Sequence, residues 1–260
     1  MTALTVAHPA PMPALLQAPV YRARLARGPA DRQAAQALRF EVFNLELDEG
    51  LVESYDLGLD EDPFDAVCDH LVVEDQASGA IVGTYRMQTG ARASEALGYY
   101  SEREFDFAPF EPLRAQMLEL GRACVHRQHR SFAVINLLWK GIAAYAREHG
   151  CRYLLGCSSI NSQDPALGAA AYRRLLAQPA PAAWQTLPMP GFACALDAVA
   201  ADAPRIPRLL SAYLALGAAI CGPPAIDREF RTIDFLTWLD IESEGLVALQ
   251  QRGRFSAKAG

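Results

Sequence analysis

The first twenty residues contain neither lysine nor arginine, so the chain lacks the positively charged start of a secretory signal peptide. The six cysteines show no CxxC spacing, which excludes a metal-finger pattern. Most of them lie in apolar runs, and we expect reduced core cysteines in a cytoplasmic protein. Neither uncharged segment suits a membrane-spanning helix of roughly 20 residues, because prolines interrupt 175–196 and end the apolar run 209–226.

A basic excess is also missing. The 260 residues carry 24 Lys+Arg and 30 Asp+Glu, a net charge of −6, which argues against a nucleic-acid-binding surface. The hydrophobic share of 51% excludes disorder over most of the chain. The charge is uneven, since residues 46–75 hold twelve acidic and no basic residues, whereas 114–174 hold nine basic and three acidic ones. This separation indicates that the protein handles charged groups at more than one place.

Strand and helix patterns alternate through the middle of the chain, and strand patterns stand near both ends. This order predicts a single mixed α/β domain over residues 20–255, after a flexible tail at 1–19 and with a helical insertion near 164–216. The expected strands are 20–26, 70–74, 81–87, 117–125, 153–157, 218–221 and 234–241. The expected helices begin at Pro29, follow Ser131 to Glu148, and cover 164–178 and 204–216.

The most informative stretch is a strand, MLELGRACV, followed by the basic loop HRQHR and a long helix. The first N–H groups of a helix have no internal partners and attract anions such as phosphate. Arg127 and Arg130 would strengthen that attraction, although an ordinary solvated connection is an equal alternative. The loop lacks the glycines of a Walker sequence, which argues against hydrolysis of a nucleoside triphosphate.

Glu119 and Arg122 lie three residues apart on that strand, so regular pairing would direct them to opposite faces. A bulge at Gly121 would bring them to one side. A carboxylate among Leu, Met and Val is costly to bury unpaired. Glu119 is therefore either a functional group or one half of a structural ion pair, for example with Arg86.

An ordered set of motifs spans about residues 20–240. It comprises Arg39, Val42-Phe43, Asp62-Pro63-Phe64-Asp65, Cys68-Asp69-His70-Leu71, Gly83-Thr84-Tyr85-Arg86, Tyr99-Tyr100-Ser101-Glu102, Glu104-Phe105, Leu118-Glu119-Leu120-Gly121-Arg122, Leu138-Trp139, Pro207, Tyr213, Gly217 and the run from Asp227 to Phe235. This set resembles the ornithine N-acyltransferases that make lyso-ornithine lipid, in the acetyltransferase-like (GNAT) superfamily. It is more distantly similar to autoinducer synthases. The resemblance implies a mixed, mostly antiparallel central sheet flanked by helices.

The implied reaction moves a 3-hydroxyacyl chain from the thioester of acyl carrier protein to the α-amine of L-ornithine. The resemblance then makes Glu119 the general base and places Arg122 in the catalytic centre, where a nearby backbone N–H stabilises the thioester oxygen. No covalent enzyme intermediate is required, so the cysteines are not needed as nucleophiles.

Under the same resemblance, Arg39 or Arg86 would bind the ornithine carboxylate, and Asp65 and Asp69, with Asp62, would bind its side-chain ammonium. Alternatively, these acids pair with the arginines and hold the site together. Arg127, Arg130 and Ser131 are expected to meet the single phosphate of the carrier's phosphopantetheine. The loop lacks the glycine-rich sequence that favours coenzyme A, and the basic 114–174 segment suits an acidic carrier. No bound cofactor and no metal are expected.

The acyl chain needs an apolar slot, which residues 206–221 can supply. Because the product is an amphiphile, a peripheral contact with the inner membrane is a further expectation. Three alternatives stay open: an autoinducer synthase, an N-acyltransferase for another amino acid such as lysine or glycine, and a non-catalytic, haemolysin-like membrane-active protein.

Overall fold

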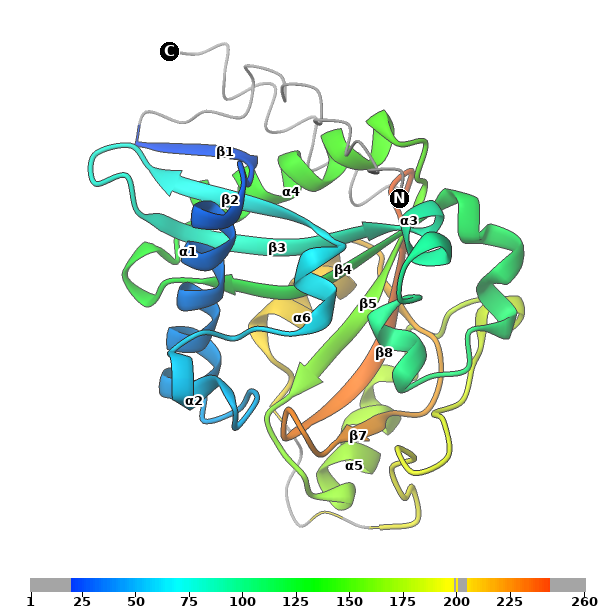
Figure 1. Cartoon of the computed structure of the whole chain (residues 1–260). Helices are drawn as coiled ribbons and strands as arrows, with labels where there is room; N and C mark the ends of the chain where they lie inside the picture. Colours follow the sequence, from blue (N-terminus) through cyan, green and yellow to red (C-terminus); the bar gives the residue numbers. More distant parts are fainter. Residues whose placement is uncertain (1–19, 199, 201–204, 244–260) are drawn as a thin grey trace, which may run out of the picture.

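The computed structural model describes residues 20–198, 200 and 205–243, so the predicted tail and the end of the predicted domain lie outside the described residues. Eight strands form one sheet in the order β1-β2-β3-β4-β5-β8-β6, and β7 pairs with β8. Within this part of the chain β4 and β5 are the parallel neighbours, and the other pairs are antiparallel. The predicted mixed, mostly antiparallel α/β fold is confirmed (Figure 1).

The strands are β1 (Tyr21–Leu25), β2 (Asp69–Asp75), β3 (Ile81–Thr89), β4 (Met117–Val125), β5 (Tyr153–Ile160), β6 (Ala219–Ile220), β7 (Ala225–Asp227) and β8 (Thr232–Asp240). The helices are α1 (Pro29–Phe40), α2 (Ser54–Leu57), α3 (Gly90–Glu95), α4 (Phe132–Glu148), α5 (Pro165–Leu175) and α6 (Arg208–Ala215). A π-helical segment, Glu41–Glu46, continues α1.

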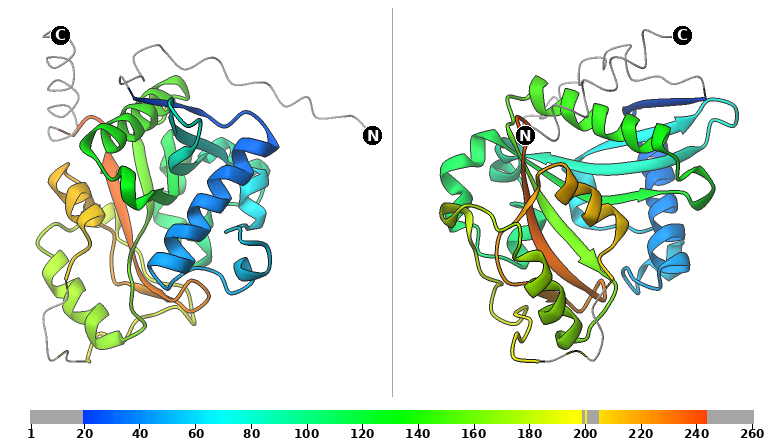
Figure 2. Two further views of the ribbon diagram at one scale, coloured as in Figure 1. Left: turned by 90° about the vertical axis from the view of Figure 1, so that its left-hand side faces the viewer. Right: turned by 180° about the vertical axis from the view of Figure 1, so that it is seen from behind.

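Helices cover both faces of the sheet. Helix α1 lies across one face, whereas α4 and α6 lie on the other (Figures 1 and 2). The bounds of α4 follow from its sequence, because the Ser131 side chain accepts from the Val134 N–H at the start and Gly150, with φ 67°, follows its end. Its apolar side packs on β1–β3 in the largest core cluster, around Leu71, Leu138 and Ile142.

The parallel pair β4–β5 is short. Met117–Glu119 pairs with Tyr153–Leu155, but β4 continues to Val125 and β5 to Ile160. The strands touch once more at Gly156, where an added Cβ would lie 2.1 Å from the Leu120 carbonyl oxygen. Beyond that contact they part, as Figure 1 shows. In the parted stretch, backbone groups of β4 that point toward β5 have no strand partner.

The sequence placed most elements but not all of their ends. Helix α5 ends at Leu175, and α6 begins at Arg208 within the predicted insertion. The segment between them holds a short 3-10 turn, Ala182–Trp184, and otherwise irregular backbone. Strand β7 was not predicted, because its three residues are too few to show a period. Within the described ranges, no helix is both long and apolar enough to cross a membrane.

Candidate active site

A β-bulge in β4 positions the candidate catalytic pair. Thr84 pairs with Cys124 and Arg86 with Gly121, so Tyr85 faces two residues of β4. Those two are Arg122, which has a φ of 48°, and Ala123. The predicted position of the bulge, Gly121, was wrong by one residue, because Gly121 itself keeps a regular partner. The bulge nevertheless brings Glu119 and Arg122 to one side, as expected. The Glu119 carboxylate accepts from the Tyr100 N–H, and the Arg122 guanidinium lies over the Tyr100 ring.

Glu119 is 5% exposed and accepts three hydrogen bonds. They come from the Tyr100 N–H (2.8 Å), the Ser101 N–H (2.8 Å) and the Ser101 hydroxyl (2.7 Å). Burial raises the pKa of Glu119 above its ordinary value, although these bonds and the charge of Arg86 oppose the shift. Its hydrogen-bond partners are thus the 100–101 turn rather than a guanidinium. The carboxylate lies where β4 and β5 part, held in one orientation.

Three arginines and three aspartates form what we call the balanced cluster: Arg39, Arg86, Arg122, Asp60, Asp62 and Asp65. Arg39 Nε donates to Asp60 (2.7 Å), and its Nη atoms donate to both carboxylate oxygens of Asp65 (2.9 and 2.6 Å). Arg86 Nη1 donates to Asp62 (2.6 Å) and Asp65 (3.2 Å). Arg122 lies 3.3 Å from Asp60 and 3.1 Å from Asp62. The charges are therefore matched one for one.

The balanced cluster is buried, and its pairing controls its ionisation. Burial alone would raise the pKa of Asp65, but the hydrogen bonds and charge of Arg39 outweigh it and lower that pKa well below its usual range. The Arg39 side chain has no exposed surface, and each of its nitrogens is bonded inside the cluster. Arg86 bonds to the aspartates through Nη1 alone, which leaves its other edge free of these acids. The predicted pairing of these acids with the arginines is thus present for Asp62 and Asp65.

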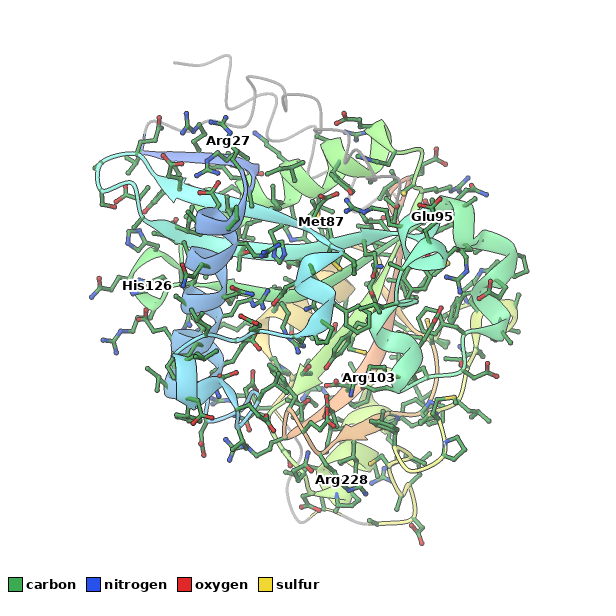
Figure 3. All side chains as sticks on the ribbon, in the orientation of Figure 1. Arg27, Met87, Glu95, Arg103, His126 and Arg228 are labelled. Carbon is green, nitrogen blue, oxygen red and sulfur yellow. The ribbon has the colours of Figure 1, made fainter. Side chains whose placement is uncertain are left out.

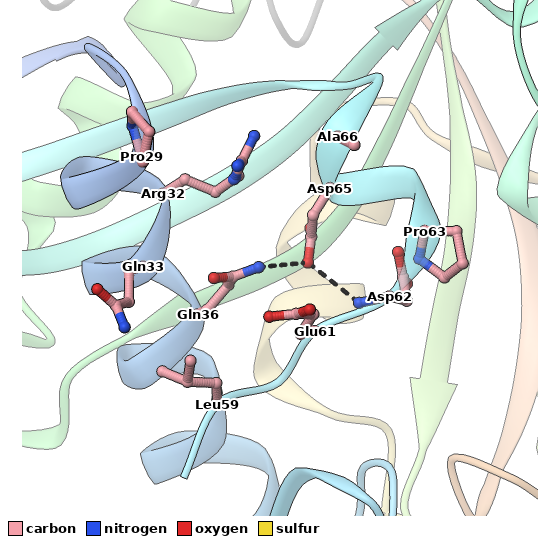
Figure 4. A pocket seen from close by; sticks show the side chains of 10 residues that line it. All are labelled: Pro29, Arg32, Gln33, Gln36, Leu59, Glu61, Asp62, Pro63, Asp65 and Ala66. Atoms are coloured by element: carbon pink, nitrogen blue, oxygen red, sulfur yellow. Dashed lines mark hydrogen bonds between the residues drawn. The ribbon is translucent and has the colours of Figure 1, made fainter. Parts of the chain in front are cut away.

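A pocket of about 520 Å³ adjoins the cluster on the side of α1. Asp62 and Asp65 belong to its wall, and Gln36 donates to Asp65 across it at 3.1 Å (Figure 4). The full lining is Pro29, Arg32, Gln33, Gln36, Leu59, Glu61, Asp62, Pro63, Asp65 and Ala66.

Asp69 does not join the other predicted acids. It accepts from Arg92 (2.7 Å) and from the Tyr145 hydroxyl (2.6 Å), outside the balanced cluster. Asp60 occupies the position beside Asp62 and Asp65 that was expected for Asp69. No local sequence pattern distinguishes Asp60 from its acidic neighbours. Tyr100 and Ser101 were also absent from the predicted site, although they lie in one of the motifs that carry the family resemblance.

The basic loop lies at the far end of β4, where Figure 3 labels His126. Arg127 is exposed on the short turn Arg127–His129. Arg130 holds the Glu46 carboxylate with two bonds, of 2.6 and 2.7 Å, so the acidic segment reaches the basic one here. The structure thus brings Arg127, Arg130 and Ser131 together at the start of α4, and any phosphate there competes with Glu46 for Arg130.

Comparison with known proteins identifies the family. Residues 38–140 match the acetyltransferase (GNAT) domain. The L-ornithine N(alpha)-acyltransferase of Brucella abortus (strain 2308) is 37% identical over 236 residues, which is 84% of each chain. The enzyme of that name from Rhodobacter capsulatus is 31% identical and covers 86% of this chain and 91% of its own. This chain belongs to the L-ornithine N(alpha)-acyltransferase family. The family resemblance read from the motifs is confirmed, and the protein is an acyltransferase.

Solved structures support the fold of this family member. The acyl-homoserine-lactone synthase LasI matches with a TM-score of 0.52 at 11% identity, covering 89% of this chain and 95% of its own. FeeM, an N-acyl amino acid synthase from uncultured soil microbes, matches with a TM-score of 0.52 at 13% identity, covering 89% and 93%. At these identities the likeness concerns the fold alone.

Proposed function

We propose that this protein transfers a 3-hydroxyacyl chain from acyl carrier protein to the α-amine of L-ornithine and so produces lyso-ornithine lipid. The names of the curated relatives support ornithine as the acceptor. The observation that carries the chemistry is Glu119, a buried carboxylate with three fixed donors at the point where β4 and β5 part.

The proposed reaction begins with removal of a proton, because an α-amine is largely protonated at neutral pH. Glu119 accepts that proton directly or through a water molecule, and its raised pKa makes it the better base. The neutral amine nitrogen then attacks the thioester carbonyl carbon and forms the new C–N bond. The C–S bond breaks, the carrier's thiol leaves with a proton, and the product is an amide.

Negative charge develops on the thioester oxygen during the attack. Backbone N–H groups of β4 that point toward β5 in the parted stretch lack a strand partner, and we assign this stabilising role to those near Arg122–Cys124. Arg122 adds a positive charge beside them, fixed between the rings of Tyr100 (4.8 Å) and Phe230 (4.4 Å). In this proposal no cysteine acts as a nucleophile, and burial raises the pKa of Cys124 away from the thiolate form.

For the acceptor, the free edge of Arg86 is the better carboxylate ligand, since each nitrogen of Arg39 is already bonded. Arg39 then acts as a positioning residue that holds Asp60 and Asp65 in place. For the donor, we assign the phosphopantetheine phosphate to Arg127, Arg130 and Ser131. The acyl slot is assigned to the 206–221 stretch, where Ile206 and Leu214 line a pocket of about 330 Å³ between α5 and α6.

One experiment tests donor and acceptor together. The purified chain is incubated with 3-hydroxyacyl carrier protein or the matching coenzyme A thioester, and with each amino acid in turn. Mass spectrometry of the lipid extract should show acyl-ornithine formed preferentially from the carrier protein. Absence of any amide product would overturn the proposal, and a different preferred amino acid would replace ornithine. Flotation with liposomes tests the proposed peripheral action at the cytoplasmic face of the inner membrane, and full activity without flotation would exclude it.

A further inference from the structure

A second group of buried acids lies next to Glu119, and we call it the acidic cluster: Glu49, Glu104, Asp227 and Asp234. Their exposed fractions are 7%, 1%, 5% and 4%. Among the described residues, none of these four carboxylates has a cationic side chain within ion-pair distance. Glu104, Asp227 and Asp234 lie in motifs that carry the family resemblance, but none of the four acids was predicted as a site residue.

Two atoms of the acidic cluster have no hydrogen-bond partner in the described structure: Glu104 Oε1 and Asp234 Oδ1. The ligand atoms of Glu104, Asp234 and Cys157 lie within 4.8 Å of one another, so these side chains converge on one place. Asp227 differs, since it accepts the N–H groups of Glu229 (2.8 Å) and Phe230 (2.9 Å). An unpaired buried carboxylate is costly, which indicates that a positive group belongs between Glu104 and Asp234.

The electrostatics agree with this geometry. Burial and the charges of Asp234 and Asp227 raise the pKa of Glu104 well above its ordinary value. Burial and the charge of Asp227 likewise raise the pKa of Asp234. Burial is the first cause of both shifts, and the like charges at the same place add to it.

A chain of contacts joins this place to the candidate base. Cys157 Sγ lies 3.8 Å from Glu104 Oε2 and 3.5 Å from Ser101 Oγ, and that hydroxyl donates to Glu119 at 2.7 Å. Cys157 is partly exposed, and it belongs to β5 beyond the point where β4 and β5 part. The acidic cluster is therefore linked to Glu119 through Cys157 and Ser101.

We propose that Glu104 and Asp234 bind the side-chain ammonium of the acceptor and select diamino acids over neutral ones. This inference rests on the proposed function, because it assumes an amino acid at Glu119. The three groups that would recognise the acceptor then follow one another across the sheet. Arg86 on β3 binds the carboxylate, and Glu119 on β4 binds the α-amine. Asp234 binds the side-chain amine from β8, the strand that follows β5 in the sheet. Neighbouring strands lie about 4.8 Å apart, so β4 and β8 are separated by about 10 Å, which an α,ω-diamino acid can span together with the hydrogen bonds at its two amines.

The chemistry of the two carboxylates fits a primary ammonium. An ammonium presents three donors around a compact charge, and Glu104, Asp234 and the nearby sulfur or hydroxyl supply acceptors on more than one side. An acceptor without the side-chain amine would leave both carboxylates unpaired, and such sites typically discriminate by about 10⁴-fold or more. Because the ammonium must enter a buried place, we expect a smaller preference, of about 100-fold.

The experiment compares L-ornithine with L-norvaline, which has the same carbon skeleton but no side-chain amine. The ratio of kcat/KM for the two acceptors is measured for the full chain and for Glu104→Gln and Asp234→Asn. The unmodified protein should prefer ornithine by about 100-fold, and either variant should lower that ratio at least about tenfold, chiefly through the KM for ornithine. Glu102→Gln is the matched control, because that neighbouring acid bonds to Arg114 instead and should keep the ratio.

The outcomes separate the two proposals. No amide from any amino acid would overturn the proposed function itself. Equal rates with ornithine and norvaline in the unmodified protein would overturn the ammonium site while leaving acyl transfer intact, and this measurement does not depend on the folding of a variant. A metal in the purified protein whose removal by EDTA abolishes the ornithine preference would also overturn it. Circular dichroism checks that each variant is folded.

Discussion

The balanced cluster and the acidic cluster both lie near the same aromatic residue, Tyr100, but they differ in how their buried charges are paired. In the balanced cluster each aspartate meets a guanidinium, so the charges of Arg39, Arg86 and Arg122 are neutralised within the protein. In the acidic cluster Glu104 and Asp234 face each other without a cation. The first arrangement pairs its charges within the protein, whereas the second has matched charges only with a positively charged ligand.

This difference separates scaffold from binding site. A buried pair that satisfies itself holds the segments that contribute it, here α1, the 60–65 segment and β3–β4. A buried group that lacks its partner reduces stability until the partner arrives. Glu119 belongs to neither class, because neutral donors fix a carboxylate that stays available for a proton. Four predictions, from the largest expected effect to the smallest, test this division.

Glu119→Gln should have the largest effect, because the amide cannot accept the proton of the incoming amine. We expect kcat to fall by about 10²–10⁴-fold with the fold retained, measured as the rate of amide formation from 3-hydroxyacyl carrier protein and ornithine. Glutamine keeps the shape, and its amide oxygen can still accept from Ser101, so circular dichroism should match the parent. A folded Glu119→Gln protein with undiminished activity would remove Glu119 as the base.

Asp65→Asn should destabilise the protein by about 3 kcal/mol or more, because it leaves Arg39 buried with half of its counter-charge removed. Asp234→Asn should change stability by less than about 1 kcal/mol, or increase it, because it removes a carboxylate that Glu104 repels. Urea unfolding followed by fluorescence measures both. Equal losses for the two variants would end the distinction between the clusters.

The two clusters should also respond to pH in opposite directions. Burial and the charge of Asp234 raise the pKa of Glu49 to about 7. The pKa of this group in the unfolded chain is about 4.3. The contribution of Glu49 to stability is therefore greatest below about pH 4.3, is lost as the pH rises toward 7, and then stays constant. By contrast, Arg39 lowers the pKa of Asp65. The stability that Asp65 contributes is therefore fully present above about pH 3.9 and is lost on acidification.

Glu49→Gln isolates the first of these effects. Between pH 5 and pH 7, the free energy of unfolding should fall by about 2 kcal/mol less in the variant than in the parent. The loss of stability on acidification should be the same in both proteins. Unfolding in urea at a series of pH values measures this. An identical pH profile in parent and variant would show that Glu49 ionises normally.

Asp69→Asn should have the smallest effect. The acid comes from the same segment as Asp62 and Asp65, but its partner Arg92 has a side chain that is 39% exposed. Pairs of this kind contribute about 0–1 kcal/mol, and the Tyr145 hydroxyl can donate to the new amide oxygen. Thermal unfolding measures the difference, and a loss as large as that of Asp65→Asn would place Asp69 with the balanced cluster after all.

Local patterns in the sequence determined the scaffold around the site. Ser131, Gly150 and the apolar period between them predict α4, and the apolar run before the basic loop predicts β4. The ordered motifs were enough to identify the family, and with it the fold. The bulge was predicted one residue early, because a glycine is the usual occupant of a positive φ and Arg122 adopts it here.

What the sequence determined by itself is therefore most of the elements and the family, and it also proposed Glu119 as the candidate base. Which acids are neutralised was decided only by the tertiary structure. Asp62 and Asp69 have the same chemistry and lie seven residues apart, but one meets Arg86 and the other Arg92. Glu104 and Asp234 are 130 residues apart in the sequence, so no local sequence pattern indicates that they converge. They converge because β8 pairs with β5, which places Asp234 beside Ser159. Buried charge depends on what surrounds it in space, and that follows from packing.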